Sequence, residues 1–506
     1  MDSPIVSSAQ MRAAEETAFK AGAQVEALMD KAGAGVARAV QQFFPRPGMC
    51  SVYAGKGHNG GDALVAAEQL RRAGWSIDLH LAFPDSVCSE LTRKKLSALR
   101  QGQGDVAQAT RLRSTENASG TLAPPSIILD GLLGLGAKSL LREPVRAAAR
   151  EINKRRRDEN AFVFAVDLPT GLDGDTGETD PEDCVTADFT ITIGYAKHGL
   201  IVDSALDFVG RLEVVPLAEL VLAETKINEV LATAHSLNAV LPRREFSAYK
   251  NQFGRIGVVA GSEGFIGAGL MTTEGALRAG AGLVELFVPK EIYPTVAAAA
   301  PAEAMVKPIR SYRDLLEETV DIWAVGPGLG TARDRELLPF IELAEQPMVL
   351  DADALNILSQ KIEILSRCRG PRLLTPHPGE MKRLFEHGKM SRAGTARHFC
   401  DQFSITLLLK GSRTIVCERE RPLSYNSTGN PGMATGGMGD VLTGVCAGLA
   451  GRKLTFYDAA RIGAWACGRA AEISIFNAKT SEESLLAREI LAHLGEAFND
   501  LRNPTV

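Results

Sequence analysis

Residues 436–440, GGMGD, lead through three glycines to a single carboxylate, Asp440. Glycine loses more conformational entropy on folding than any other residue, so this run predicts a backbone that approaches a ligand closely. The following VLTGVCAGLAG indicates a helix beginning near Asp440, and the exposed N–H groups of such a helix start bind phosphate. Asp440 is then predicted to be a general base for a hydroxyl that attacks a phosphoryl group. The alternative is that Asp440 only caps the helix.

Other segments of the second half carry residues suited to the same chemistry. KGSRT, residues 410–414, would place Lys410 and the Thr414 hydroxyl near a nucleotide phosphate, although the chain has no G-x-x-x-x-G-K-[ST] loop. The alternative for Lys410 is a solvated lysine at a strand end. His377 stands between two prolines that fix its backbone, which suggests a substrate contact. Asp353 in DADALN is read equally well as a cap at a turn.

The first half contains a glycine-rich turn between a predicted strand and helix, VYAGKGHNGGDALVAAEQL, residues 52–70. Gly55, Gly57 and Gly60 meet the G-x-G-x-x-G spacing of a dinucleotide-binding turn. That spacing alone is a weak signal, and no acidic residue closes a second strand in the dinucleotide manner. Asn59 and Asp62 are instead expected to offer side-chain oxygens from inside the loop.

Further oxygen-bearing residues follow two other predicted strands. Asp130 lies in DGLLGLGAKSLLREP, and Asp167 and Thr170 lie in VDLPTGLDGDTGE. Oxygens of Asn59, Asp130 and Thr170 suit a hard cation, and one carboxylate among neutral partners fits a monovalent ion better than Mg²⁺. The alternative is helix capping by Asp62 and Thr170. Three such loops at consecutive strand ends favour the functional interpretation.

Apolar runs separated by helical patterns must position these residues. Continuous apolar strands between helices predict parallel sheets covered on both faces, in an α/β fold. Strands of the first half are predicted at 49–55, 76–83, 125–132, 161–168 and 188–194. A second series is predicted at 255–261, 282–289, 321–328, 347–353, 371–377 and 404–411. Because parallel strands deliver their loops to one edge, the glycine-bearing segments of each half should meet there.

The segment 216–249 between the two series reads as helical and polar-punctuated, and the domain boundary is predicted within it, near Lys226. This gives tandem doubly wound domains at 1–225 and 226–506. A length of 506 residues fits two to four domains, and a net charge of −5 gives no general basic field for nucleic acid. No apolar run reaches the length of a membrane span, and residues 1–19 lack the apolar core of a signal peptide. Eight scattered cysteines without a C-x-x-C pair predict free thiols and a cytoplasmic setting.

The second half resembles the ADP-dependent NAD(P)H-hydrate dehydratases of the ribokinase-like superfamily, in order through residues 245–495. The resemblance rests on GSEGFIGAGLMTTEGALRAGAGLVELFVP, AVGPGLG, VLDADALNIL, LLTPHPGE, LLLKGSRTIV and GNPGMATGGMGDVLTG. It implies phosphorylation of the hydroxyl on carbon 6 of the hydrated nicotinamide ring, with Asp440 as base, and then loss of phosphate to regenerate NAD(P)H. GGMGD is similar to the form in members that use ADP, giving AMP and phosphate. Residues implied to contact the hydrated nucleotide are Ala268, Gly328, His377 and Asp440. Residues implied to hold the adenine nucleotide are Lys410, Gly411, Ser412, Arg413, Thr414 and Gly439.

Residues 8–218 resemble the NAD(P)H-hydrate epimerase domain called YjeF N-terminal, on the three loops above and on ADFTITIGYAKHGLIVDSA. The resemblance implies a Rossmann-like fold, K⁺ at Asn59, Asp130 and Thr170, and acid–base work by Asp167. Residues implied to line the substrate are His58, Asn59, Gly60, Gly61, Asp62, Gly134, Leu135, Gly136, Ala137, Lys138, Ser139, Leu140 and Asp167. The chain departs from the family at His58, where Asn is usual, at Ala63, where Gly is usual, and at Thr170, where Ser is common.

The leading hypothesis is a lyase and an isomerase on one chain, which epimerises R- and S-NAD(P)HX and dehydrates the S form with ADP. The expected ligands are NAD(P)HX, ADP, K⁺ and, as a further candidate ion, Mg²⁺. A homo-oligomer without nucleic-acid or membrane partners is expected. The first alternative is a ribokinase-like small-molecule kinase with a YjeF-type binding domain, which would accumulate a phosphorylated product. The second is a nucleotide-binding module without turnover, against which the presence of Asp130 and Asp167 argues.

Overall fold

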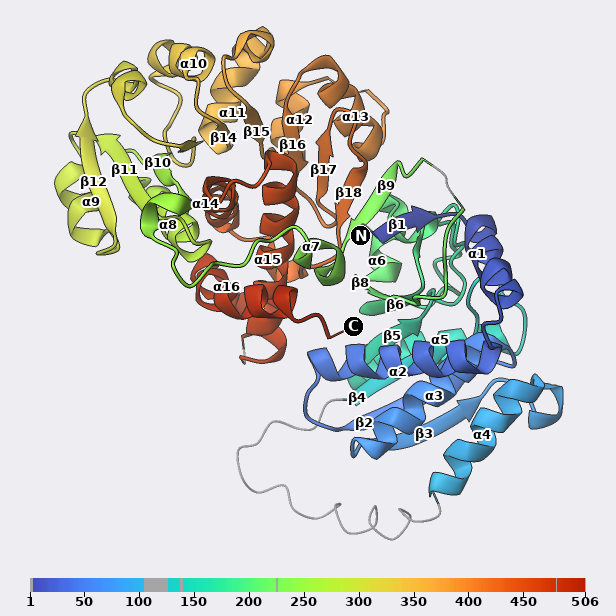
Figure 1. Cartoon of the computed structure of the whole chain (residues 1–506). Helices are drawn as coiled ribbons and strands as arrows, with labels where there is room; N and C mark the ends of the chain where they lie inside the picture. Colours follow the sequence, from blue (N-terminus) through green and yellow to red (C-terminus); the bar gives the residue numbers. More distant parts are fainter. Residues whose placement is uncertain are drawn as a thin grey trace, which may run out of the picture. The chain divides into compact units, whose positions relative to one another are not determined.

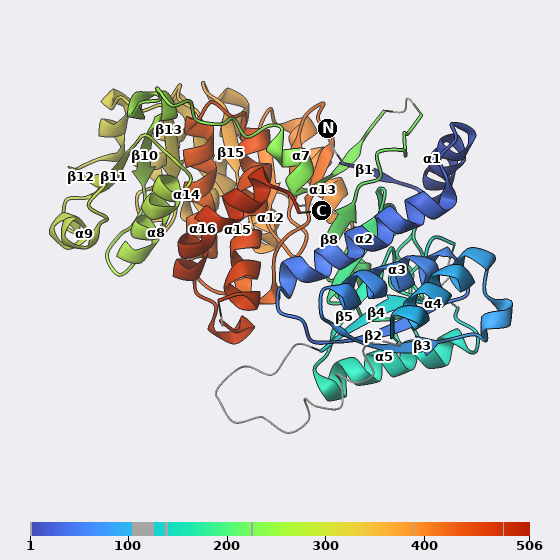
Figure 2. The same cartoon turned by 60° about the horizontal axis from the view of Figure 1, so that its bottom comes forward.

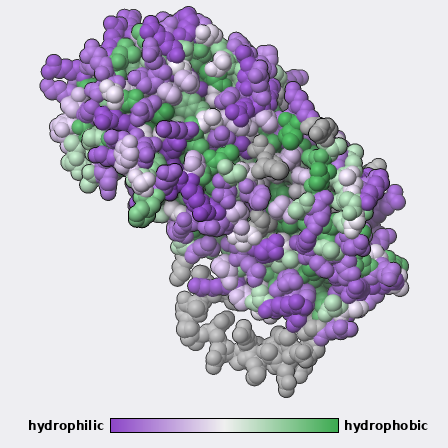
Figure 3. Space-filling model, viewed as in Figure 1, coloured by the Kyte–Doolittle hydropathy of each residue, from purple (hydrophilic) through white to green (hydrophobic). Residues whose placement is uncertain are grey.

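The chain forms two compact units, Ser3–Ile227 and Asn228–Pro504 (Figure 1). The computed structural model describes residues 3–103, 126–136, 140–223, 226–386, 388–478 and 480–505. Within these ranges, none of the helices combines the length and apolar character that crossing a bilayer needs. On the face of the C-terminal unit seen in Figure 3, hydrophilic side chains predominate, with hydrophobic ones scattered between them.

The N-terminal unit is built around a parallel sheet. The strands are β1 (Ser3–Val6), β2 (Met49–Ala54), β3 (Ser76–Leu81), β4 (Ser126–Gly131), β5 (Phe162–Val166), β6 (Phe189–Ile193), β7 (Ala196–Lys197) and β8 (Arg211–Val215). The helices are α1 (Ser8–Lys20), α2 (Val25–Phe43), α3 (His58–Arg72), α4 (Glu90–Gln103), α5 (Val145–Glu159) and α6 (Leu206–Val209), with 3₁₀ turns at Asp85–Val87, His198–Leu200 and Asp203–Ala205.

The strand order of this sheet is β3-β2-β4-β5-β6-β8, with every pairing parallel, and β1 pairs separately with β7. Helices α2 and α3 lie on one face of the sheet and α5 lies on the other (Figure 2). The chain leaves β2 toward β3 and leaves β4 toward β5, in opposite directions. In sheets of this kind the crevice at such a reversal, beyond the carboxyl ends of the strands, binds ligands.

The C-terminal unit has a larger mixed sheet. Its strands are β9 (Glu229–Ala232), β10 (Arg255–Val259), β11 (Leu283–Pro289), β12 (Ala304–Ile309), β13 (Ile322–Val325), β14 (Met348–Leu350), β15 (Arg372–Leu374), β16 (Thr406–Leu409), β17 (Ile415–Glu418) and β18 (Leu423–Asn426). Its helices are α7 (Ala234–Asn238), α8 (Ile266–Arg278), α9 (Tyr293–Ala299), α10 (Asp334–Leu343), α11 (Ala352–Leu358), α12 (Pro378–Leu384), α13 (Arg392–Gln402), α14 (Met438–Gly451), α15 (Phe456–Phe476) and α16 (Ala487–Arg502). The 3₁₀ turns are Lys250–Phe253, Tyr312–Glu317, Ser359–Arg367, Pro431–Met433 and Glu482–Ser484.

The strands of this unit follow the order β12-β11-β10-β13-β14-β15-β16-β17-β18-β9. All pairings are parallel except β16 with β17 and β17 with β18. The order reverses between β10 and β13, so the loops after these two strands meet at the carboxyl edge. Helices α8, α14, α15 and α16 pack together on one face, while α10, α11, α12 and α13 belong to the other (Figure 1).

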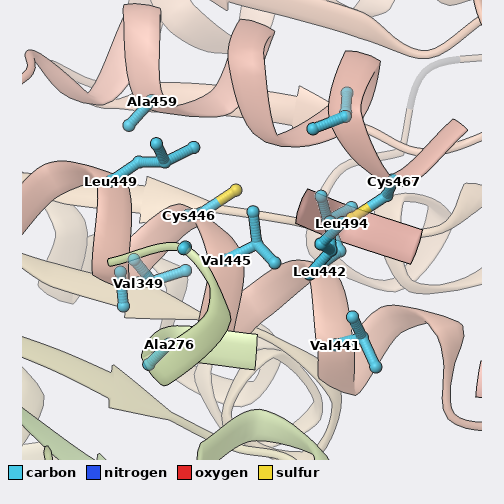
Figure 4. Close-up of a cluster of buried hydrophobic side chains, with 14 of the residues drawn as sticks. Ala276, Val349, Val441, Leu442, Val445, Cys446, Leu449, Ala459, Cys467 and Leu494 are labelled. Atoms are coloured by element: carbon cyan, nitrogen blue, oxygen red, sulfur yellow. The ribbon is translucent and has the colours of Figure 1, made fainter. Parts of the chain in front are cut away.

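Helix α14 lies in the centre of the hydrophobic core of the C-terminal unit (Figure 4). Its residues from Val441 to Gly451 are all buried, as expected for a helix that is apolar on every side. A side chain at Gly444 would lie 2.0 Å from the carbonyl oxygen of Thr272, and one at Gly448 would lie 2.6 Å from that of Ala276. Two of the glycines therefore let α8 and α14 approach closely, and α14 holds its N-terminal end firmly at the sheet edge.

The predicted α/β class with parallel sheets is confirmed, and every predicted strand is present, trimmed by one to four residues at its ends. The helical reading of 216–249 is wrong, because that segment is mostly irregular and contains strand β9 and only the short helix α7. Its apolar residues recur at helical spacing, but Val230 and Leu231 are buried by pairing β9 with β18. Tertiary pairing thus overrides the local pattern.

Candidate active sites

In the C-terminal unit, an acidic residue, a lysine and a threonine from three elements form a connected polar cluster. Asp351 follows β14, Lys410 follows β16 and Thr443 lies on α14. The Lys410 ammonium donates to Asp351 Oδ1 over 2.7 Å, and the Thr443 hydroxyl donates to Asp351 Oδ2 over 2.8 Å. Because Asp351 is buried, both oxygens need these partners. Lys410 is therefore held in one place at the carboxyl edge of the sheet.

Asp440 lies in the first turn of α14, which begins at Met438 after Gly437 in the left-handed region, φ 87°. No side chain caps this helix start, so its first N–H groups remain available to an anion. Burial raises the pKa of Asp440 to about 6, with a further rise from the charge of Asp351 and an opposing effect from Lys410. At neutral pH the carboxylate is ionised and close to the pKa that suits a general base.

Gly439 separates this helix start from the cluster. A side chain there would lie 3.2 Å from Lys410 Nζ and 3.3 Å from Asp351 Oδ2. The glycine therefore keeps open the space above the ammonium, where a phosphate would have access to both the cation and the helix N-terminus. The predicted grouping of Lys410, Gly439 and Asp440 is consistent with this geometry.

His377 has a structural role that the sequence analysis did not predict. Its ring Nδ1 accepts a hydrogen bond from the Gly379 N–H over 2.9 Å, and the Glu380 carboxylate accepts one from the His377 N–H over 2.8 Å. These two hydrogen bonds together cap the start of α12. The imidazole remains half exposed, and Glu380 Oε2 lies 3.9 Å from Lys410 Nζ. The capping bonds thus fix His377 next to the cluster without covering it.

Ala268 lies in the first turn of α8, which follows β10, and Gly328 lies in the loop after β13. A side chain at Gly328 would lie 2.9 Å from the Ala268 Cβ, so the two predicted contact residues are adjacent. The alternative interpretation of DADALN, in which Asp353 caps a helix, is wrong, because α11 already begins at Ala352, directly after Asp351. The Asp353 carboxylate instead accepts a hydrogen bond from the Gly330 N–H over 2.8 Å. Asp353 therefore fixes the loop after β13.

The KGSRT segment is only partly gathered at the cluster. Lys410 enters the cluster, whereas the Thr414 hydroxyl donates to the Gly411 carbonyl over 3.2 Å. Gly411 and Ser412 are exposed, and Arg413 is buried. The structure thus leaves Gly411 and Ser412 accessible beside Lys410.

In the N-terminal unit, Asp130 and Thr170 are joined directly. Asp130 is fully buried, and its carboxylate accepts from the Thr170 hydroxyl over 2.7 Å, the Thr170 N–H over 2.8 Å and the Leu132 N–H over 3.2 Å. Burial raises the pKa of Asp130 to about 6, although these hydrogen bonds act in the opposite direction and lower it. The Leu133 N–H donates to the Thr170 hydroxyl over 3.1 Å, which ties the loop after β4 to the same pair.

Asn59 approaches the same loop from α3. A side chain at Gly134 would lie 3.0 Å from Asn59 Oδ1, and the buried Asn59 Nδ2 has no hydrogen-bond partner. In the described ranges Asp130 forms no ion pair with a basic side chain, and no group of three histidine, cysteine or acidic residues suits a metal. A buried carboxylate, a hydroxyl and an amide without a cationic partner fit a monovalent cation better than a multivalent one.

The glycine-rich turn is shorter than the sequence predicts. Helix α3 already begins at His58, so Asn59 and Asp62 lie in its first turns, not inside the loop, and Asp62 does not cap it. A side chain at Gly55 would lie 1.9 Å from the Leu132 carbonyl oxygen, and one at Gly60 would lie 2.1 Å from that of Gly55. This tight packing explains the early helix start and places Asn59 next to the β4 loop.

Asp167 forms a buried ion pair with Lys197, a residue that the sequence analysis did not single out. The fully buried ammonium also donates to the Thr192 hydroxyl and the Ile193 carbonyl, each over 3.0 Å. Asp167 has φ 68°, which is uncommon for a residue other than glycine and is often found at functional sites. The backbone conformation of Asp167 and its ion pair with Lys197 together hold the carboxylate in one orientation.

Two further acids lie near this pair. Asp62 is 9% exposed, and its pKa is raised well above the ordinary value by burial and then by the charges of Asp167 and Glu15. Burial and then Asp167 also raise the pKa of Glu15, on α1. Burial and the charge of Asp167 thus favour the protonated forms of Asp62 and Glu15, and a carboxyl group that keeps its proton beside an ion pair can act as a proton donor.

The remaining predicted residues of the first half are placed as follows. His58 is exposed at the start of α3, and Gly60 and Gly61 are buried behind it. Gly134, Leu135 and Gly136 follow β4, with Arg12 next to Gly136, and Leu140 is 80% exposed. Ala137, Lys138 and Ser139 lie outside the described residues.

The residues that sequence reasoning missed are Glu15, Lys197, Asp351 and Thr443. Asp351 precedes Asp353 by two residues in DADALN, and Thr443 follows Asp440 by three residues in GGMGDVLTG. Lys197 in YAKHG gave one signal: a lysine directly after an apolar strand pattern. Glu15 lies on a helix far from the loops along the chain, and no local pattern marks it.

Comparisons with known proteins add to this geometry. A family described as NAD(P)H-hydrate dehydratase matches residues 256–493, and a family described as YjeF-related protein N-terminus matches residues 25–199. The bifunctional NAD(P)H-hydrate repair enzyme Nnr of Moorella thermoacetica is 34% identical, over 94% of this chain and 92% of its own length. The enzyme of the same description from Escherichia coli is 33% identical, over 96% and 92% of the two chains.

Among solved structures, the ADP/ATP-dependent NAD(P)H-hydrate dehydratase from Bacillus subtilis, co-crystallised with ATP and Mg²⁺, is similar to part of this chain. The two share 28% sequence identity with a TM-score of 0.48, over 54% of this chain and 99% of the other.

Proposed function

The chain belongs to the family of bifunctional NAD(P)H-hydrate repair enzymes, and we propose that its two domains, 1–225 and 226–506, each carry one of the two activities. The N-terminal domain interconverts the R and S epimers of hydrated NAD(P)H. The C-terminal domain dehydrates the S form. Damage produces both epimers, so an epimerase on the same chain prevents a stereospecific dehydratase from leaving one of them unrepaired.

Asp440 acts as the general base of the dehydratase. It takes the proton from the hydroxyl on carbon 6 of the hydrated ring, and that oxygen attacks the terminal phosphorus of ADP as the bond to AMP breaks. Phosphate then leaves carbon 6 with the electron pair of the C–O bond and carbon 5 loses a proton, which restores the ring double bond of the reduced nicotinamide. The raised pKa of about 6, at an uncapped helix start, is the single observation that carries this proposal.

The nucleotide is held by Lys410, Gly411, Ser412, Arg413, Thr414 and Gly439. Lys410 meets the transferred phosphate, since its ammonium is fixed by Asp351 and faces the open space at Gly439. Ala268, Gly328 and His377 contact the hydrated nicotinamide nucleotide. Mg²⁺ would accompany the nucleotide and offset the negative charge of its phosphates.

In the N-terminal domain, Asp167 exchanges the proton needed for epimerisation. The buried pair with Lys197 holds the Asp167 carboxylate in place, and the raised pKa values of Asp62 and Glu15 favour a proton on one of these neighbours. The substrate is lined by His58–Asp62 and by the segment 134–140. Asn59, Asp130 and Thr170 would hold K⁺, whose charge would help to bind the phosphates of the hydrated nucleotide.

The partners proposed are NAD(P)HX and ADP, with a cytoplasmic location and a homo-oligomeric state. A mixture of both NADHX epimers, incubated with ADP, ATP or neither, tests the function through the returning absorbance of reduced nicotinamide. Complete recovery with ADP supports both domains and the choice of donor. Recovery that stops partway would contradict the epimerase activity of the N-terminal domain. A phosphorylated product without NADH would favour the alternative of a small-molecule kinase.

A further inference from the structure

Five arginines line one cavity of the C-terminal unit, at the end of α14 opposite to Asp440. The cavity measures about 560 Å³, and its lining includes Arg243, Arg244, Arg278, Arg452 and Arg502. From Asp440 to Arg452 the helix advances about 18 Å at 1.5 Å per residue, so the cavity is separate from the proposed dehydratase site.

Arg243, Arg244 and Arg278 are exposed at the rim of the cavity, Arg452 and Arg502 are half-buried, and the group has few acidic partners. In the described part of the chain, only Arg278 forms an ion pair, with Glu274. Arg452 and Arg502 both donate to the Pro242 carbonyl, over 2.9 Å and 3.1 Å, and Arg244 donates to that of Gly280 over 2.6 Å. These bonds, together with the Phe253 ring 3.9 Å below the Arg244 guanidinium, fix the groups without supplying a carboxylate to any of Arg244, Arg452 or Arg502 among the described residues.

Two guanidinium nitrogens are buried with no hydrogen-bond partner, Arg452 Nε and Arg502 Nη1. Burial and then the charges of Arg244 and Arg502 lower the pKa of Arg452 to about 10, and burial followed by Arg243 lowers that of Arg502. Such a cluster is costly unless an anion occupies it, because each guanidinium destabilises its neighbours.

A purely structural role for the cluster would be to neutralise helix ends. Helices α8, α14 and α16 all end at the cavity, at Arg278, Gly451 and Arg502, and each C-terminus carries about half a negative charge. Five arginines less Glu274 leave four positive charges against roughly one and a half negative ones. A surplus of more than two charges remains, which matches a multiply charged ligand.

We propose that this cavity, lined by Arg243, Arg244, Arg278, Arg452 and Arg502, is a second ligand site that binds a phosphate-bearing polyanion. Guanidinium groups bind phosphate through paired N–H bonds, which distinguishes this chemistry from binding of a monocarboxylate. Leu241 and Phe498 complete the lining with apolar surface and accommodate the uncharged part of a ligand. The site does not depend on the proposed repair chemistry.

Calorimetric titration of the full chain with inorganic pyrophosphate tests the proposal. The wild-type protein should bind pyrophosphate, and Arg452→Gln should weaken binding by about 10- to 100-fold, the loss of a charge-assisted contact. Arg243→Gln gives a second variant that keeps the fold, because Arg243 is exposed and forms no hydrogen bond to the described residues. It should weaken binding in the same direction.

Two controls separate this site from other anion sites. Arg335→Gln, an exposed arginine on α10, should leave pyrophosphate affinity unchanged. Lys410→Met removes only the pyrophosphate that the proposed dehydratase site binds, so binding at the cavity should persist in this variant. Loss of binding in Lys410→Met with full binding in both cavity variants would place the anion at the dehydratase site and overturn the proposal. Absence of pyrophosphate binding by the wild-type chain would overturn it as well.

Discussion

The Lys410 ammonium, which follows β16, lies 2.7 Å from Oδ1 of Asp351, which follows β14. The other oxygen of Asp351 is occupied by the Thr443 hydroxyl, so the pair is locked to α14. The same two charges act in opposite directions on Asp440, since Asp351 raises its pKa and Lys410 lowers it. The pair therefore both positions a phosphate-binding cation and sets the protonation of the proposed base.

Substitutions in this pair should shift the acidic limb of the dehydratase pH profile in opposite directions. The wild-type limb is expected near pH 6, where Asp440 loses its proton. Asp351→Asn removes a negative neighbour and should move the limb to lower pH, whereas Lys410→Met should move it to higher pH. Initial rates at limiting substrate across pH give the comparison. Shifts of the same sign would contradict the assignment of Asp440.

Asp440→Asn should reduce dehydratase turnover by about 10²- to 10⁴-fold, the usual contribution of a general base, and leave epimerisation intact.

The raised pKa of Asp440 means that the folded state holds the proton more tightly than the unfolded state between about pH 4 and pH 6. The contribution of Asp440 to stability therefore falls as pH rises through that window. The uncharged variant should melt at the same temperature as wild type near neutral pH, or higher. Unchanged turnover would refute the role of base.

Lys197→Met should abolish epimerase activity and destabilise the N-terminal unit, because it leaves Asp167 as a buried charge without its partner. Breaking a buried pair typically costs about 3–5 kcal/mol. The double variant with Asp167→Asn should recover part of that stability but none of the activity. Urea unfolding monitors the first quantity, and epimerisation of a purified NADHX epimer monitors the second. Additive losses of stability would argue against a direct pair.

Potassium should stabilise the N-terminal unit against heat more at about pH 7.5 than at about pH 5. Proton and cation compete for Asp130, whose pKa of about 6 leaves it mostly neutral at the lower pH. Thr170→Val removes an oxygen of the proposed site and should eliminate the K⁺ effect, while a similar substitution at Thr186 serves as the control. Equal stabilisation by K⁺ at both pH values would count against a site at Asp130.

Several features of the site were visible in the sequence, because motifs report local chemistry. The GGMGD run predicted a helix start with an acid in its first turn, and α14 begins at Met438 with Asp440 two residues on. The strand patterns predicted which loops share an edge, and Ala268 and Gly328 accordingly lie side by side. The helical reading of 216–249 failed, because β9 is stabilised by pairing with β18 from far along the chain.

Local sequence by itself determined the α/β class, the strand series of each unit and the acids that end their strands, because hydrophobic periodicity and glycine act over a few residues. Only the tertiary structure decided which groups surround those acids. Lys197 meets Asp167, Asp351 meets Lys410, and five arginines from separate segments meet at one cavity. Burial and charge depend on neighbours brought together by the fold, so pKa values and anion sites are properties of the packed chain.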